Sequence, residues 1–155
     1  MRRLGLADVA LVGALNVEPP PEFTYWMFYG TANDGGDWGI QFNRLQLRDT
    51  VGGIDIPPTV AGSSAGTGIG PERLFGGDND TTWRGGDPPA WAYYQFTEPY
   101  SIVQYVIRAN SSHADLSPSA WTIEASNDGD NWTVMDTRTG ETGWGNNMER
   151  TYLIG

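Results

Sequence analysis

The segment between Trp121 and Trp132 constrains the fold of this chain more than any other. In Trp121-Thr-Ile-Glu-Ala, apolar and polar residues alternate with the period of two that is typical of a half-buried strand. Ser-Asn-Asp-Gly follows at residues 126–129, and Asp-Gly tolerates the positive φ that a tight hairpin needs. Trp132 then begins a returning strand. The segment therefore predicts an aromatic β-hairpin, a unit that suits a β-sandwich.

The remaining sequence favours the same fold class. The 155 residues are enough for one domain with a modest core, and 7 Trp, 7 Tyr and 5 Phe supply large side chains to fill it. The 21 Gly and 10 Pro predict many turns and few long helices. A change of phase near Asn43, within an alternating stretch at residues 39–48, predicts a β-bulge. Residues 51–70 are rich in Gly, Ser, Thr and Pro and predict a long surface loop. We expect an all-β, antiparallel β-sandwich of jelly-roll type.

Charge and composition exclude several classes of function. The formal net charge of −10 argues against binding to nucleic acid or to an anionic membrane. No stretch reaches the roughly 18 apolar residues of a membrane span. The chain has no Cys, which excludes disulfides and thiol catalysis. Its one histidine, His113, excludes zinc sites built on several histidines.

The chain divides into an N-terminal apolar arm with a proline-rich joint, residues 1–21, and one domain, residues 22–155. Arg2 and Arg3 precede an apolar run as in a signal peptide, but Asp8 interrupts that run and no clear cleavage site follows. Pro19-Pro-Pro21 predicts a stiff, extended joint. An apolar arm must pack on its own domain or on a neighbouring subunit, and both alternatives stay open. A docking arm predicts a homo-oligomer or a place in a larger assembly.

Several motifs stand in one order along the second half of the chain. They are Gly77 to Trp83, the aromatic stretch Pro89 to Phe96, Ile102 to Ile107, Pro118 to Gly129 with Trp132, and Glu149 to Ile154. This order resembles the discoidin-like, or galactose-binding-like, domains (coagulation factor type C). The resemblance covers residues 24–154, and the Ser-Asn-Asp-Gly hairpin with its flanking tryptophans is its most specific part.

The first half of the chain extends the resemblance. Tyr25-Trp26 and the segment at residues 43–49 are similar to a pair that usually lies near the C-terminus of such domains. Versions with that pair at the front are similar to domains in bacteriophage virion and tail proteins. The resemblance implies a non-catalytic, virion-associated module that binds host cell-surface carbohydrate through end loops. The alternative is a structural capsid or tail decoration protein, without glycan specificity, that docks on other virion proteins through residues 1–18. Both imply an extracellular particle, or secretion if the protein is not viral.

The resemblance also implies a structural Ca²⁺ site, with ligands among Asp78, Asp80 and Thr81. Calcium is held by six to eight hard oxygens. The motif departs from the family at Gly76, which replaces an aspartate, and at Arg44, which replaces a glutamate. One alternative is that Ca²⁺ is retained. Another is that Arg44 pairs with Asp78 or Asp80 in place of the ion, and a third is a solvated acidic turn. No cofactor besides Ca²⁺ is expected.

Carbohydrate binding needs an aromatic ring for the apolar face of a sugar, together with planar polar groups for its hydroxyls. End loops of the sandwich are the expected place for both. Trp38 and Trp144 lie in Gly-rich loops and are the favoured ring candidates, whereas Trp83 occupies a core-edge position in the family. Four further tryptophans alternate within predicted strands and are expected in the core: Trp26, Trp91, Trp121 and Trp132. The predicted carbohydrate-binding residues are Trp38, Trp144, Trp83, Arg84, Arg108 and His113.

No pattern in the chain supports an enzyme. A Ser-His-Asp triad would have to use His113, and the Gly-x-Ser-x-Gly elbow does not occur. Acidic residues are abundant, but nothing singles out a pair for glycoside hydrolysis. We therefore expect a protein without catalytic activity.

Overall fold

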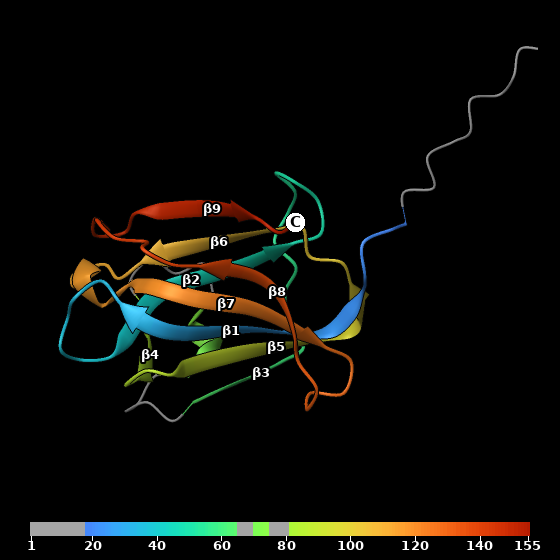
Figure 1. Cartoon of the computed structure of the whole chain (residues 1–155), viewed down its shortest axis with the longest axis horizontal. Coiled ribbons are helices and arrows are strands. Elements are labelled where there is room, and N and C mark those ends of the chain that lie inside the picture. Colours follow the sequence, from blue (N-terminus) through green and yellow to red (C-terminus); the bar gives the residue numbers. More distant parts are fainter. Residues whose placement is uncertain (1–17, 65–69, 75–80) are drawn as a thin grey trace, which may run out of the picture.

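A computed structural model describes residues 18–64, 70–74 and 81–155, and these residues form two antiparallel sheets (Figure 1). The larger sheet has five strands in the spatial order β3-β5-β1-β7-β8. Its members are β1 (Phe23–Asn33), β3 (Val60–Ser63), β5 (Ala90–Tyr100), β7 (Pro118–Ser126) and β8 (Thr133–Arg138).

The smaller sheet has four strands in the order β4-β2-β6-β9. These are β2 (Ile40–Arg48), β4 (Trp83–Gly86), β6 (Gln104–Ala109) and β9 (Glu149–Leu153), and two short 3₁₀ helices, η1 (Pro71–Leu74) and η2 (Ala114–Leu116), lie in the connections. The two sheets confirm the expected β-sandwich. Within the described part of the chain, no helix has the length and apolar character that a membrane crossing requires.

The predicted hairpin is present as β7 and β8, which pair from Ala125 with Thr133 to Trp121 with Arg138. Its turn is held by Asp128, whose carboxylate accepts hydrogen bonds from the backbone N–H groups of Asp130 and Asn131, at 2.9 and 2.8 Å. These bonds favour the charged form and hold the pKa of Asp128 well below its usual range. Gly129 has φ +78°, the left-handed conformation that the Asp-Gly pair predicted.

The core lies between the two sheets and is rich in aromatic rings. Trp26 and Trp121 are buried there, as expected from their alternation, and Phe28 packs against the rings of Phe42 and Trp83. The Trp121 indole N–H donates to the Tyr105 hydroxyl at 3.0 Å, so that the buried indole keeps a hydrogen-bond partner. The expectation that aromatic residues fill the core is therefore correct for these positions.

For Trp91 and Trp132 the expectation of a core position is wrong, because both are half-buried on the outer face of the larger sheet. On β5 the residues that face the core are Ala90, Ala92, Tyr94 and Phe96. The core has little room beside Ala90, because a Cβ added to Gly85 of β4 would lie 2.8 Å from the Ala90 Cβ. At the start of β5 the small side chains of Ala90 and Ala92 thus face inward, and the larger rings of Trp91 and Tyr93 face outward.

Two local predictions in the first half of the chain have different outcomes. The bulge expected near Asn43 is confirmed, since the pairing of β2 with β6 shifts between Phe42 and Arg44. The surface loop expected over residues 51–70 is only partly correct. Its middle forms β3, an edge strand that pairs with β5 from Val60 to Ser63.

Candidate functional site

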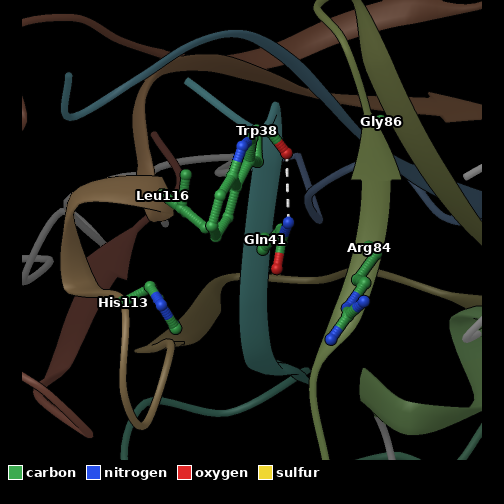
Figure 2. Close-up of a pocket in the computed structure, with 6 residues that line it drawn as sticks. All are labelled: Trp38, Gln41, Arg84, Gly86, His113 and Leu116. Atoms are coloured by element: carbon green, nitrogen blue, oxygen red, sulfur yellow. Dashed lines mark hydrogen bonds between the residues drawn. The ribbon is translucent and has the colours of Figure 1, made fainter. Parts of the chain in front are cut away.

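A hollow of about 320 Å³ opens where β2 begins, beside the end of β4 and the loop between β6 and β7. Figure 2 shows Arg84 and His113 on opposite sides of Gln41, with the Trp38 ring above them. The residues that line the hollow are Trp38, Gln41, Arg84, Gly86, His113 and Leu116. Three of the predicted carbohydrate-binding residues, Trp38, Arg84 and His113, therefore lie together.

Trp38 is held in place by the backbone around it. Gly39 has φ +76°, and a Cβ at this position would lie 2.2 Å from the carbonyl oxygen of Gly86. Only glycine therefore allows the chain to pass so close to β4. Asn33 fixes the loop from its other side, since its amide donates to the carbonyls of Gly36 and Gly39 at 2.8 and 2.7 Å. This loop presents Trp38 from a well-bonded backbone.

His113 is positioned by a second loop. The buried Asn110 accepts hydrogen bonds through Oδ1 from the backbone N–H groups of Ser112 and His113, both at 3.0 Å. The Ser112 hydroxyl lies 3.0 Å from His113 Nδ1. The centroids of the Trp38 and His113 rings are 5.8 Å apart. His113 therefore forms one wall beside the Trp38 ring.

The two loops are bonded to each other. The Asp34 N–H donates to the Ser117 carbonyl at 2.9 Å, and the Gly36 N–H donates to the Asp115 carbonyl at 3.1 Å. Gly36 also packs closely on Leu116, where a Cβ would approach Cδ2 to 2.3 Å. These contacts join the two walls of the hollow into one preorganised unit.

Trp38 projects from this unit with an exposed ring. Its side chain is 69 % exposed, whereas the other six tryptophans, all among the described residues, are buried or half-buried. A second hollow of about 190 Å³ lies beside the first, and Trp38, His113 and Leu116 border both. Asp37 and Asp115 complete the second hollow. An apolar ring is thus flanked by donors on one side and by carboxylate acceptors on the other, the set that sugar hydroxyls require.

The sequence analysis missed five residues that border the two hollows: Asp37, Gln41, Gly86, Asp115 and Leu116. The phase of the strand at 40–48 contained the signal for Gln41, because it places this residue opposite the buried Ile40 and Phe42. For Asp115 and Leu116 no local pattern pointed to the site. Their position depends on the contact between two loops that lie about 80 residues apart in the sequence.

Trp144 corrects the expectation of a second exposed ring, since its side chain is only 7 % exposed and belongs to the core. Its indole N–H donates to the carbonyls of Pro118 and Glu141 at 2.9 and 3.0 Å. The Arg150 guanidinium lies 4.1 Å from the ring centroid and so covers the ring. No face of Trp144 is left for a sugar to stack on.

Trp83 is also buried, at 0 % exposure, so its indole cannot reach a ligand in this structure. Arg108 lies on β6, away from the residues that line the hollow, and its guanidinium pairs with Glu149 at 3.3 Å. Arg44 of β2 pairs with the same carboxylate at 3.4 Å. Trp83, Arg108 and Trp144 are therefore not brought to the Trp38 hollow.

The predicted calcium ligands can be followed only in part. Asp78 and Asp80 lie outside the described residues, and Thr81 is half-buried two residues before the start of β4. Within residues 18–64, 70–74 and 81–155, no three His, Asp or Glu side chains gather as a metal site. The three alternatives for this segment stay predictions.

Comparison with known families agrees with the fold. Residues 58–153 match the model of the F5/8 type C domain, a range that covers more than half of the chain. The chain therefore belongs to the F5/8 type C (discoidin) family. Domains of this family commonly bind carbohydrates or lipids and are generally non-catalytic binding modules. No curated protein and no solved structure matches the chain significantly.

Proposed function

We propose that this domain binds carbohydrate at the hollow beside Trp38. The exposed Trp38 ring carries the proposal, because an aromatic ring at a loop end is the surface on which the apolar face of a sugar stacks. Arg84, His113 and Gln41 surround the ring with planar polar groups that can donate to hydroxyls. The bonded loops hold Trp38 and His113 in place before the ligand arrives, which lowers the entropic cost of binding.

Carbohydrate fits this end of the molecule better than lipid does. Lipid binding by an end loop requires apolar side chains that enter the membrane, and Trp38 is accompanied at its hollows by the charged groups Asp37, Arg84 and Asp115. The net charge of −10 also repels the anionic surface of many membranes. A polar, hydroxyl-rich ligand satisfies the same groups.

The test is a glycan array probed with the full chain, in buffer with Ca²⁺ and in buffer with a chelator. Trp38→Ala is compared with the unchanged chain, and Ile54→Ala serves as the matched control, since Ile54 is an 87 % exposed apolar loop residue that lines neither hollow. We expect binding to one group of glycans, a loss of at least tenfold in Trp38→Ala and no loss in Ile54→Ala.

Two outcomes would overturn the proposal. One is a folded protein that binds no glycan on the array, and the other is a Trp38→Ala variant that binds as well as the unchanged chain. Binding to neutral or anionic phospholipid vesicles, abolished by Trp38→Ala and accompanied by silence on the array, would replace carbohydrate with lipid. Glycan binding that requires Ca²⁺ would favour a retained calcium site over the other two alternatives, which are a replacement of the ion by Arg44 and a solvated acidic turn.

We also propose that the module serves on a virus-like particle and recognises the host there. The support is the order of the chain: the family match begins at residue 58, so β1 and β2 precede it, as the resemblance to front-loaded phage domains implies. Mass spectrometry of purified particles should then detect the chain at a fixed copy number. Its absence from such particles would contradict this part of the proposal.

A further inference from the structure

A groove lies on the outer face of the larger sheet and shares no lining residue with the hollows beside Trp38. It encloses about 290 Å³, and β1 forms its floor through Met27. Rings from β5 and from the β7–β8 turn form its walls. The lining residues are Met27, Tyr29, Trp91, Tyr93, Gly129 and Trp132.

The rings around this groove support one another. The Trp91 and Tyr93 rings lie 6.1 Å apart and within 18° of parallel. Tyr93 can lean over β3 because residue 62 is a glycine, whose Cβ would lie 2.3 Å from the tyrosine ring. Tyr25 contacts Tyr93 on one side and Trp132 on the other, at centroid distances of 6.2 and 6.4 Å. These ring contacts form a continuous apolar surface. Apolar surfaces of this kind commonly mark sites of interaction with a partner.

The N-terminal joint leaves the domain at one end of this groove. Thr24, at the start of β1, donates through its N–H to Asn127 of the β7–β8 turn at 3.2 Å. Residues 18–22 are exposed, and Figure 1 shows them running away from the sheet at that end. Three consecutive prolines at 19–21 favour an extended joint of about 3.1 Å per residue.

The arm before this joint has the composition that the groove accepts. Residues 1–17 include ten Leu, Val or Ala side chains. Their charged side chains are Arg2, Arg3 and Asp8. The arm is therefore formally +1, and the remaining chain is −11 in a total of −10. Seventeen extended residues reach up to about 60 Å, whereas a five-stranded sheet is roughly 24 Å wide.

We propose that residues 1–17 of one chain pack into the aromatic groove of a second copy. Apolar side chains of the arm fill the space over Met27 between the rings, and the opposite charges of arm and domain favour the encounter. Each copy has one arm and one groove. In a pair of chains, each arm can therefore be buried in the groove of the other chain. This surface is separate from the proposed carbohydrate site, and either can exist without the other.

The first test uses the absence of cysteine in the chain. Unlabelled Ala7→Cys chains are mixed with isotope-labelled Thr122→Cys chains and mildly oxidised, so that mass spectrometry identifies a bond between two different chains. Thr122 lies opposite Tyr29 on the outer sheet face. The matched control is Leu153→Cys, at a 55 % exposed position on β9 of the other sheet. We expect at least tenfold more mixed dimer with Thr122→Cys than with Leu153→Cys.

Equal yields from the two positions would overturn the proposal. A chain that carries both Ala7→Cys and Thr122→Cys tests packing within one copy. An internal bond that forms in dilute solution, with a monomeric mass, would show that the arm returns to its own groove and would also overturn the proposal.

The second test is sedimentation equilibrium of the full chain over a range of concentrations. We expect reversible association that Trp132→Ser and Tyr29→Ser each weaken at least tenfold, while Leu153→Ser leaves it unchanged. Circular dichroism establishes that the variants are folded, and two groove variants are used so that one unfolded protein does not decide the result. A wild-type chain that stays monomeric at every concentration, or groove variants that associate normally, would refute the proposal.

Discussion

Trp38 and Trp144 lie in Gly-rich loops of similar sequence character, yet the molecule uses them in opposite ways. Trp38 is 69 % exposed at the mouth of a hollow, and Trp144 is 7 % exposed within the core. The difference depends on the partners that each loop meets. Asn33 and Gly39 lead the first loop out against β4, whereas the second loop offers its indole N–H to two backbone carbonyls. A Gly-rich context alone therefore does not distinguish a binding residue from a core residue.

The Trp144 loop has a further anchor in its charged neighbours. Arg150 covers the indole and donates to Glu141 at 2.9 Å, and the Tyr152 hydroxyl donates to the same carboxylate at 2.9 Å. Burial and this bond raise the pKa of Tyr152 well above its usual range. The Trp144 loop thus contributes to the stability of the domain, whereas the Trp38 loop leaves its ring exposed for ligand binding.

The largest expected effect is that of Trp144→Ala. Removal of a buried indole that packs in the core should lower the free energy of unfolding by about 3–5 kcal/mol. Urea denaturation measures the change. If Trp144 were a ligand residue instead, this variant would keep its stability and lose only glycan binding, and the contrast between the loops would fail.

Gly39→Ala should have the next largest effect. The new Cβ would meet the Gly86 carbonyl at 2.2 Å in a left-handed conformation, and we expect a loss of about 1–3 kcal/mol. Gly35→Ala is the matched control, since Gly35 also has positive φ but has no atom near its Cβ. Thermal unfolding compares the two, and equal losses would mean that the close approach to β4 does not position the Trp38 loop.

Arg150→Lys tests how much the stacked guanidinium contributes to the stability of the Trp144 loop. Lysine keeps the charge but cannot lie flat on the indole while it bonds to Glu141 and to the Thr142 carbonyl. The expected cost is about 1 kcal/mol, measured by urea denaturation with Arg84→Lys, at an exposed position, as the control. An unchanged midpoint would show that the stacked guanidinium does not contribute to loop stability.

Trp38→Ala should have the smallest effect on stability, within about 0.5 kcal/mol, because the exposed ring contributes little to the core. Differential scanning calorimetry of this variant, beside Trp144→Ala, tests the comparison directly. A fall in stability of several kcal/mol would mean that the ring supports the loops, and its loss would then no longer isolate ligand contact.

Much of the fold was predictable because it depends on local patterns. The alternation at residues 121–125 and the Asp-Gly pair specified the β7–β8 hairpin, and the phase change near Asn43 specified the bulge. The inward or outward direction of Trp91 was not predictable from β5 alone. It depends on how much space the facing sheet leaves, which is set by Gly85 and Trp83 on another strand.

The candidate site was predictable to a similar extent. Residue type and loop position were enough to propose Trp38, Arg84 and His113, which the structure brings together. The same criteria also proposed Trp144, because burial depends on which chain segments return to cover a loop. The position of Asp115 at the second hollow depends on a contact between two loops, and no local sequence pattern predicts that contact.

The position of β1 has a consequence for how the protein is made. This strand is the third of five in the larger sheet, and its partners β5 and β7 lie about 60 and 90 residues further along the chain. A ribosome therefore completes Tyr25-Trp-Met-Phe-Tyr29 well before either neighbour exists to pair with it. An unpaired, strongly aromatic strand is prone to aggregate in that interval. Heterologous expression should thus favour slow synthesis at low temperature, or a chaperone that shields nascent chains.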